Sequence, residues 1–376
     1  MRIVFTGGGT GGHFYPLIAV AQALGSLERE RSLPALELFY FGPEPYDLKS
    51  LEALGIQFKK SPAGKLRRYF SFKNITDIFK TLGGIVIATG QLFSIYPDVV
   101  FSKGGYASFP TLVAARLLRI PVVIHESDIV PGRVTKWAAA FARRIAVSYP
   151  ETASAFQGKN VARLGNPIRA ELLAPALGTE ALPHGFEAQA PLLLVLGGSQ
   201  GAKRINDAVL EALPKLVERY QVLHQTGPSN YEEVRATASV ALRDNPNAKH
   251  YKAVPFLETK ELSIVGQRAS LIISRAGSGT IFEIAAWGVP AIVVPIPETI
   301  SHDQRKNAFS YGRSGGAVVI EESNLSPNLL IAEIDRILSN PELTESMKAA
   351  AHSFGSTDAA YKIAEGLLEI ALQHEQ

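Results

Sequence analysis

The chain contains no cysteine, so it forms no disulfide and no thiolate metal site, which fits a reducing compartment. Charge is scarce as well: charged residues make up 19% of the sequence and the net charge is only +3, which argues against a general nucleic-acid binder. The uncharged apolar stretch Thr81 to Pro97 has about 17 residues, whereas a spanning helix needs ~20, so we expect it not to cross a membrane. Because Met1-Arg2 leads directly into a strand pattern, we expect no signal peptide.

The apolar residues that are present gather in short runs separated by helical patterns. A hydrophobic fraction of 46% is ample for burial, and 376 residues exceed one ordinary core, so the length indicates two domains. Alternating strands and helices are typical of parallel sheets built from βαβ units. We expect strands at 3–6, 36–41, 99–102, 122–125, 144–147, 192–196, 221–225, 249–254, 271–274, 291–295 and 317–320.

A glycine-rich turn joins a strand to a helix twice, about half a chain apart. The first turn, Gly7 to His13, follows strand 3–6, and the second, Gly197 to Ala202, follows strand 192–196. We therefore predict an α/β fold with two Rossmann-like parallel-sheet domains, at 1–166 and 167–355. The last helical segment, about 356–376, has no strand after it, and we expect it to pack back on the first domain.

The first glycine turn suits an anion such as phosphate. Glycines let the backbone approach a ligand closely, and the following helix, expected from Pro16 to Leu24, presents its N-terminal N–H groups. The fingerprint G-x-G-x-x-G fits Gly7, Gly9 and Gly12, although this pattern alone is a weak signal. His13 adds a titratable group at the end of the turn, which indicates chemistry and not only binding.

A third turn, Arg275 to Thr280, lies between strand 271–274 and a helix expected from Ile281 to Trp287, with Gly288 ending that helix. Glu283 would lie in the first turn of this helix, where its carboxylate could accept hydrogen bonds from a ribose diol. The alternative is a simple favourable charge at a helix start, which contributes a few tenths of a kcal/mol.

Taken together, these motifs resemble the MurG family of bacterial glycosyltransferases, from about residue 2 to residue 310. The motifs that carry the resemblance are Gly8-Gly9-Thr10-Gly11-Gly12-His13, Gly104-Gly105-Tyr106, His125-Glu126, Gly165-Asn166-Pro167-Ile168-Arg169, Gly197-Gly198-Ser199-Gln200-Gly201-Ala202, Arg275-Ala276-Gly277 with Glu283, and Asp303-Gln304 with Asn307-Ala308. The resemblance implies the GT-B architecture, in which two Rossmann-like domains face each other across a cleft. It also implies an inverting enzyme that moves N-acetylglucosamine (GlcNAc) from UDP-GlcNAc to the 4-hydroxyl of the lipid-linked muramyl-pentapeptide, lipid I, to make lipid II.

The resemblance assigns donor contacts residue by residue. Thr10, Gly11 and Gly12 would border the donor sugar and its pyrophosphate, and Arg169 and Ser199 would reach the phosphates. The remaining donor contacts would be Leu257 and the loop Arg275, Ala276, Gly277, Ser278, Gly279, Thr280 and Ile281 on uracil and ribose, Glu283 on the ribose hydroxyls, and Gln304 on the GlcNAc ring.

On the acceptor side the resemblance implies Gly104, Gly105 and Tyr106. At position 128 the family usually has Asn and this chain has Asp128. An amide both donates and accepts, whereas an ionised carboxylate only accepts. A direct contact of Asp128 with the donor sugar is therefore in question, and an acceptor-side base is the other interpretation.

The expected chemistry is displacement at an anomeric carbon. UDP is already a good leaving group, so backbone N–H groups, a helix N-terminus and Arg169 can stabilise its charge, and with no Asp-x-Asp pair in a suitable loop we expect no metal cofactor. The attacking sugar hydroxyl needs a general base, for which His13 is the first candidate. A hydrogen bond that anchors the loop, or a contact to phosphate or acceptor, is the alternative for His13, and we expect His125 to be structural.

A basic and aromatic region bears on where the enzyme works. Lys65, Arg67 and Arg68 precede three aromatic residues, Tyr69, Phe70 and Phe72. After them come apolar residues that recur at helical spacing, namely Ile75, Ile78, Phe79, Leu82, Ile85 and Val86. One interpretation buries this stripe in the core, and it is favoured for most of these residues. The other docks part of it on the anionic cytoplasmic face of the cell membrane, which suits a lipid-linked acceptor.

Three rival functions are open. Gly197-Gly198-Ser199-Gln200-Gly201 fits the nucleophile elbow of α/β-hydrolases, with Asp303 and His352 as the arguable partners, but two glycine turns would then have no role. A nucleotide-sugar sensor and another UDP-sugar enzyme, such as an epimerase, use the same architecture. Turnover of UDP-GlcNAc with and without the lipid-linked acceptor separates these functions.

Overall fold

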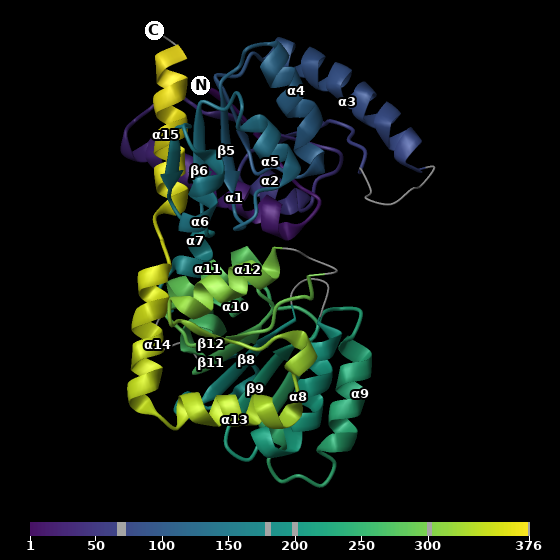
Figure 1. Ribbon diagram of the computed structural model, residues 1–376, viewed down its shortest axis with the longest axis vertical. Coiled ribbons are helices and arrows are strands. Elements are labelled where there is room, and N and C mark those ends of the chain that lie inside the picture. The colour runs from purple at the N-terminus through teal and green to yellow at the C-terminus, as the bar shows by residue number, and fades with distance from the viewer. Residues whose placement is uncertain (66–72, 177–181, 198–201, 299–302, 375–376) are drawn as a thin grey trace. The chain divides into compact units, whose positions relative to one another are not determined.

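The computed structural model describes residues 1–65, 73–176, 182–197, 202–298 and 303–374, and these form two compact units (Figure 1). The first unit combines Met1–Ala170 with the C-terminal Thr357–Gln376, and the second is Glu171–Ser356. The chain thus leaves the first unit and returns to it at the end.

The first unit is built on a seven-stranded parallel sheet in the order β3-β2-β1-β4-β5-β6-β7. Its strands are β1 (Arg2–Thr6), β2 (Glu37–Gly42), β3 (Gln57–Lys60), β4 (Val99–Ser102), β5 (Val122–Glu126), β6 (Arg144–Val147) and β7 (Val161–Arg163). Its helices are α1 (Gly11–Glu30), α2 (Leu48–Ala53), α3 (Lys73–Ile95), α4 (Phe109–Leu117), α5 (Arg133–Ala138), α6 (Pro150–Ala153) and α15 (Ala359–His374).

Successive residues of β1 enter different cores, because side chains alternate across a strand. Ile3 and Phe5 pack with α1 and α15 on one face of the sheet, whereas Val4 packs with α3, α4 and α5 on the other. The sheet is therefore covered on both faces, as its nearly continuous apolar strands require.

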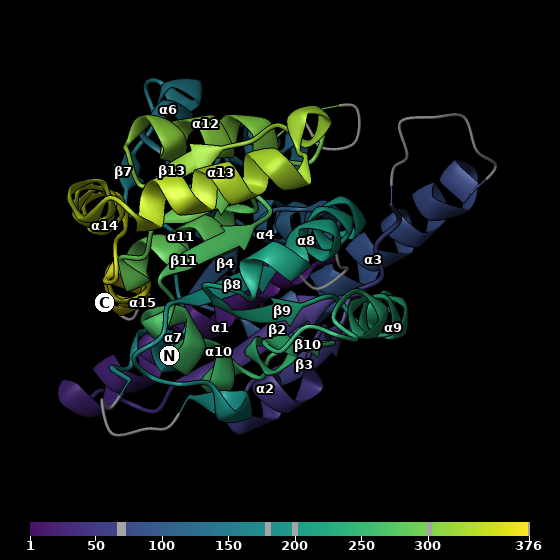
Figure 2. The same cartoon turned by 90° about the horizontal axis from the view of Figure 1, so that it is seen from below.

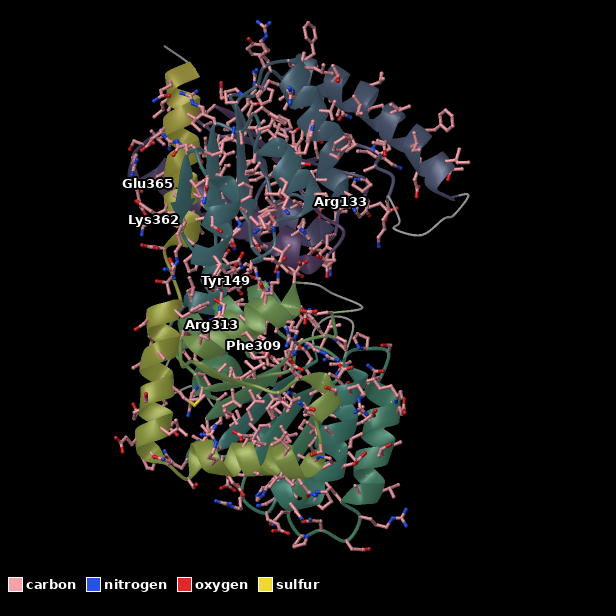
Figure 3. All side chains as sticks on the ribbon, in the orientation of Figure 1. Arg133, Tyr149, Phe309, Arg313, Lys362 and Glu365 are labelled. Carbon is pink, nitrogen blue, oxygen red and sulfur yellow. The ribbon has the colours of Figure 1, made fainter. Side chains whose placement is uncertain are left out.

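Helix α15 is held on the first unit by its core and by its charges. Ile363 and Leu367 are buried against α1. Arg31 pairs with Glu365, which is labelled on α15 in Figure 3, and Arg144 Nη1 lies 2.7 Å from Glu369 Oε2. The end of the chain thus completes a core that begins at residue 3.

The second unit contains a six-stranded parallel sheet in the order β10-β9-β8-β11-β12-β13. Its strands are β8 (Leu192–Leu196), β9 (Gln221–Gln225), β10 (Tyr251–Val254), β11 (Leu271–Ser274), β12 (Ala291–Val293) and β13 (Ala317–Val319). Its helices are α8 (Lys203–Leu216), α9 (Tyr231–Ala241), α10 (Thr259–Arg268), α11 (Ser278–Trp287), α12 (Gln304–Arg313), α13 (Pro327–Leu338) and α14 (Pro341–Phe354), while the short α7 (Ala170–Leu173) lies at the boundary between the units.

Helix α8 occupies the middle of one face of this sheet, between α9 and α13 (Figure 2). Val209 of α8 and Ile334 of α13 pack with Val195 and Ile273 from the strands. On the other face α11 ends at Gly288, which adopts the left-handed conformation (φ 66°) that favours glycine at a helix C-terminus.

All eleven expected strands are present, and two more lie at the edges of the first sheet. These are β3 and β7, whose residues are mostly half-buried or exposed. Helix α1 begins at Gly11, five residues before the expected start at Pro16, because the carbonyl of Thr10 already accepts from the N–H groups of His13 and Phe14. Helix α11 begins three residues earlier than expected, at Ser278.

The core-facing interpretation of the apolar stripe on α3 is wrong for most of its described residues. Exposed members of the stripe are Ile75, Ile78, Phe79, Leu82 and Val86, and Ile87 and Phe93 on the same helix are exposed too. The helix instead packs through Asp77, Gly84, Ala88 and Leu92. The reason is steric: a Cβ on Gly84 would lie 1.8 Å from the Pro62 carbonyl oxygen, so a large side chain does not fit at this contact.

Among the described helices, Ile75–Ile95 of α3 is long and apolar enough to cross a membrane by length and composition alone. Only 17% of the window that meets this test is buried, so α3 differs from an ordinary core helix. Arg67, Arg68, Tyr69, Phe70 and Phe72 lie outside the described residues.

Candidate active-site loops

Each sheet has one point at which the strand order reverses, and the predicted glycine turns lie there. The reversal occurs between β1 and β4 in the first unit and between β8 and β11 in the second. In open α/β sheets, ligands bind outside the carboxyl ends of the two strands at such a point. Gly7 to Gly12 and Gly104-Gly105 follow β1 and β4, and Gly197 and Arg275 to Thr280 follow β8 and β11.

In the first unit the turn after β1 is shaped by close backbone contacts. Gly8 and Gly9 have φ values of 145° and 96°, a region that residues with a Cβ resist. Tyr40 donates its hydroxyl to the carbonyl of Gly7 at 2.5 Å, and a Cβ on Gly8 would lie 2.8 Å from that hydroxyl. The ring of Tyr106 leaves equally little room at Gly9, where a Cβ would lie 3.0 Å away.

His13 is the third residue of α1 and not the end of a loop, because the helix begins early. Its Nδ1 lies 3.0 Å from Thr10 Oγ1, which fixes the ring at the helix start. Gly105 covers the other side of the ring, since a Cβ there would lie 3.6 Å from Nε2. The structure thus brings together the predicted residues Thr10, His13 and Gly105.

Behind this loop lies Lys103, a residue that the sequence did not single out. Its side chain is 2% exposed, although lysine is almost never fully buried. Its Nζ lies 2.5 Å from His125 Nδ1 and 3.4 Å from Asn166 Oδ1, and it also donates to Ser127 Oγ. Burial lowers the pKa of Lys103 to about 7, against the opposing fields of Glu126 and Asp128.

Electrostatics in this region favour a neutral imidazole at His13. Burial, followed by the charge of Lys103, lowers the pKa of His13, and Asp128 acts in the opposite direction. The His13 side chain is half-buried, so the charge of Lys103 acts on it beside the cost of burial. Burial also raises the pKa of Glu126 to about 6, with the neighbouring Asp128 acting in the same direction.

Asp128, His125 and Arg169 all belong to the first unit. The half-buried Asp128 donates its backbone N–H to Glu126 Oε1 at 3.2 Å. His125 is fully buried, and its Nε2 lies 2.8 Å from the carbonyl of Gly165. The guanidinium of Arg169 stacks on the ring of Tyr15 at 4.1 Å, next to the first turn of α1.

In the second unit the turn after β11 borders open space. A Cβ on Gly277 or Gly279 would meet no atom within 4 Å, whereas Ala276 is fully buried. Arg275 anchors the start of the turn through a largely buried ion pair with Glu322, at 2.5 Å. The start of the turn is therefore held in place, whereas the backbone at Gly277 and Gly279 stays accessible, as ligand binding requires.

Glu283 lies in the second turn of α11, not the first, because the helix starts at Ser278. The dipole effect falls off within the first turn, so the interpretation as a simple helix-start charge loses its support. Leu257 is buried, and its N–H donates to Gln225 Oε1 at 3.0 Å. Gln304 begins α12, and its Oε1 accepts from the N–H of Ile296 at 3.3 Å. Ser199 lies outside the described residues.

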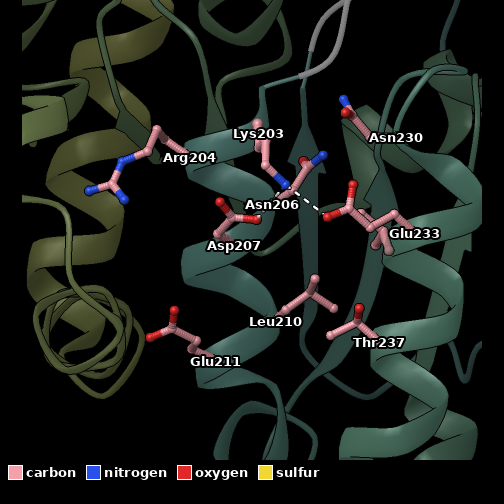
Figure 4. A pocket seen from close by; sticks show the side chains of 10 residues that line it. Lys203, Arg204, Asn206, Asp207, Leu210, Glu211, Asn230, Glu233 and Thr237 are labelled. Carbon is pink, nitrogen blue, oxygen red and sulfur yellow. Dashed lines mark hydrogen bonds and ion pairs between the residues drawn. The ribbon is translucent and has the colours of Figure 1, made fainter.

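A cavity of about 260 Å³ lies between α8 and α9, and its lining includes Lys203 at the start of α8 (Figure 4). Lys203 closes one side of it by pairing with Glu233 at 2.9 Å and with Asp207 at 3.6 Å. Its charges thus neutralise one another, and we assign no ligand to it. In the part of the chain that the structure describes, no group of three or more His, Cys, Asp or Glu residues could hold a metal ion.

Two Rossmann-like sheets with glycine-rich turns at their reversal points are the fold of GT-B glycosyltransferases. Residues 3–147 match the glycosyltransferase family 28 N-terminal domain, and residues 192–365 match the family's C-terminal domain. A relative from Treponema denticola, named UDP-N-acetylglucosamine--N-acetylmuramyl-(pentapeptide) pyrophosphoryl-undecaprenol N-acetylglucosamine transferase, is 36% identical over 97% of this chain and 96% of its own length. The protein of that name from Listeria welshimeri is 33% identical over 98% of this chain and 99% of its own.

Solved structures with a similar fold include a member of the same family. The crystal structure of MurG from Acinetobacter baumannii matches with a TM-score of 0.74 and 25% identity, over 98% of this chain and 99% of that one. A UDP-GlcNAc 2-epimerase from Neisseria meningitidis has a TM-score of 0.71 over 98% and 100% of the two chains, but at 16% identity it shares only the fold. The chain belongs to glycosyltransferase family 28 and, within it, to the MurG transferases.

Proposed function

We propose that this protein transfers GlcNAc from UDP-GlcNAc to a polyprenyl-pyrophosphoryl-MurNAc-pentapeptide, and so makes lipid II for peptidoglycan synthesis. Membership of the MurG transferases supports the reaction. The observation that carries the site is that both strand-order reversals bear glycine-rich turns, one next to His13 and the other next to Glu283.

The turn after β11 takes the UDP part of the donor in this proposal. Gly277 and Gly279 leave room for the ligand. The N–H groups in the first turn of α11 point out of the N-terminal end of the helix, where this ligand would bind. Glu283 accepts from the ribose hydroxyls, Leu257 borders the uracil, and Gln304 reads the sugar ring. Arg169 and Ser199 hold the phosphates.

The turn after β1 takes the reacting centre, and His13 acts as the general base. The acceptor hydroxyl attacks the anomeric carbon, the bond from that carbon to the β-phosphate oxygen breaks, and the hydroxyl proton passes to His13. With Nδ1–H donating to Thr10 Oγ1, Nε2 keeps the lone pair that this step needs. One in-line displacement inverts the α-linked donor to a β-glycoside. Backbone N–H groups and Arg169 stabilise the leaving UDP, so no metal is required.

We further propose that the enzyme works at the cytoplasmic face of the membrane, with α3 lying on the anionic surface. The exposed apolar residues of α3 support this, since one face of the helix is apolar and open. A spanning position is disfavoured because the Gly84, Ala88 and Leu92 face is already packed on the first unit and Asp77 is buried there.

The deciding experiment measures UDP release and sugar transfer from UDP-GlcNAc with and without the lipid-linked muramyl-pentapeptide. The proposed transferase makes a β-linked disaccharide only when the acceptor is present. Production of another UDP-sugar without acceptor would identify an epimerase, and binding without turnover would identify a sensor.

A further inference from the structure

We infer that Lys103 is a positioning residue of the transfer reaction: its buried ammonium fixes His125, Ser127 and Asn166 behind the first glycine turn and holds His13 in its neutral, proton-accepting form. The inference rests on the proposed role of His13 as the base.

The first step concerns the hydrogen bonds of the ammonium. An ammonium has three donors. The structure gives Lys103 three acceptors, namely His125 Nδ1, Ser127 Oγ and Asn166 Oδ1. Ser127 in turn donates to Asn166 Oδ1 at 2.8 Å. One buried cation thus ties the end of β5 to the segment that leaves β7.

The second step concerns charge. The carbonyl of Gly165 can only accept, so His125 Nε2 carries the ring proton and Nδ1 accepts from Lys103. All three acceptors of Lys103 are therefore neutral groups. Glu126 and Asp128 act on this charge without being among these three hydrogen-bond acceptors of Nζ, and the ammonium also acts on His13.

The third step places that charge next to His13. Lys103 donates its backbone N–H to the carbonyl of Thr6, and a Cβ on Gly7 would lie 3.1 Å from the Cβ of Lys103. Two residues later, Gly105 covers the imidazole. Thr10, in the turn before α1, contacts the His13 ring, and the charges that act on it come from Lys103 in the loop after β4 and Asp128 in the loop after β5.

The arrangement bears on how His13 takes up a proton. The pKa of Lys103 is about 7, so its ammonium is present below neutral pH and opposes a second positive charge at His13. The carboxylate of Asp128 acts in the opposite direction and favours the imidazolium that forms when the acceptor hydroxyl gives up its proton.

The test follows kcat/KM for the lipid-linked acceptor from pH 5.5 to 8.5, and the titration of the His13 ring by NMR in histidine-labelled protein, assigned with His13→Gln. In Lys103→Met, the pKa of His13 should rise and the acid limb of the profile should move to higher pH. A histidine with the ordinary pKa of 6.5 is about one-quarter neutral at pH 6, so the ratio of kcat/KM at pH 6 to that at pH 8 should fall, by up to about fourfold. Lys136→Met, an exposed lysine of the same unit, should leave the profile unchanged.

Two further variants separate charge from packing. Asn166→Asp places a carboxylate at the position 3.4 Å from Nζ with almost no change of shape, and should also raise the pKa of His13. Ser127→Ala removes a hydrogen bond but keeps the charge, and Lys103→Arg keeps the charge in another shape, so both should leave that pKa low. If the His13 titration is the same in Asn166→Asp and the wild type, the inference is wrong, even if Lys103→Met does not fold.

Failure of the proposed function has a different signature. If the wild type transfers no sugar, or if His13→Gln keeps its kcat, the role of His13 is wrong. The NMR titration still decides whether Lys103 controls the protonation of His13.

Discussion

At the scale of single residues, the proposed chemistry depends on the surroundings of the His13 ring. Thr10 Oγ1 lies 3.0 Å from Nδ1, and a Cβ on Gly105 would lie 3.6 Å from Nε2, in van der Waals contact with it. In the proposed mechanism a hydrogen bond orients the base, and glycine at position 105 adds no side chain beside Nε2.

His13→Ala should lower kcat by about 10²–10⁴-fold, the usual contribution of general-base catalysis. The KM for UDP-GlcNAc should change little, because backbone groups, Glu283 and Arg169 hold the donor. Steady-state kinetics with both substrates varied gives the two constants. A kcat within a few-fold of wild type together with a raised KM would make His13 a binding residue, and Asp128 or Glu126 would then be the candidate base.

Glu283→Gln should weaken donor capture, because the ribose hydroxyls lose a charged acceptor. Such hydrogen bonds contribute about 1.5–3 kcal/mol, which corresponds to a rise of about ten- to hundredfold in KM for UDP-GlcNAc. Glu218→Gln, an exposed carboxylate of the same unit, serves as the control. An unchanged KM in a correctly folded Glu283→Gln protein would remove Glu283 from the donor site.

The burial of Lys103 and its contacts could not be predicted from the sequence. Within Ser102-Lys103-Gly104-Gly105 it has the pattern of an exposed loop lysine, since neither periodicity nor composition marks burial there. Its place after a buried strand, at the reversal between β1 and β4, was the available signal. Its partners His125, Ser127 and Asn166 come from other segments, so only the folded chain reveals the contact.

At the scale of elements, the sequence predicted the strands that are buried, because burial requires apolar residues. Strands such as β1, β8 and β11 are buried over most of their length and were predicted, whereas the edge strands β3 and β7 have exposed polar positions and were not. The starts of α1 and α11 were placed too late, because glycine and serine read as loop residues although their first N–H groups need no helical partner. On α3, Asp77, Gly84, Ala88 and Leu92 form the packed face, whereas most of the large apolar residues are exposed.

The open face of α3 gives a prediction at this scale. Replacing Phe79, Val86 and Phe93 by Gln should reduce co-sedimentation with phosphatidylglycerol vesicles by at least tenfold. Each large apolar side chain transferred from water contributes roughly 1.5–3 kcal/mol, and these three are between 70% and 73% exposed. Val240→Gln on α9, where the side chain is 64% exposed, is the matched control.

Charge supplies a second check on the same face. Reversing Lys65, Arg67 and Arg68 to Glu should weaken vesicle binding by ~1 kcal/mol for each charge removed, and added salt should weaken the wild type in the same direction. If binding ignores both the apolar changes and the charges, α3 does not contact the membrane.

At the scale of the whole molecule, the chain closes its first unit with its last helix. The core around β1 contains Phe5 and Leu17 from the start of the sequence and Leu367 from the end. Such a core forms only after the second unit has been synthesised, so the stability of the first unit depends on residues more than 300 positions away from β1.

Leu367→Ala should therefore destabilise the first unit selectively. Truncating a fully buried leucine costs about 2–5 kcal/mol, because apolar contact is lost and a cavity remains. Hydrogen exchange read by mass spectrometry should show faster exchange in β1, α1 and α15, with β8, β11 and α11 unchanged. Leu372→Ala on the same helix, where the side chain is 39% exposed, should have little effect. Equal loss of protection in both sheets would show instead that the two units unfold together and that α15 stabilises the molecule as a whole.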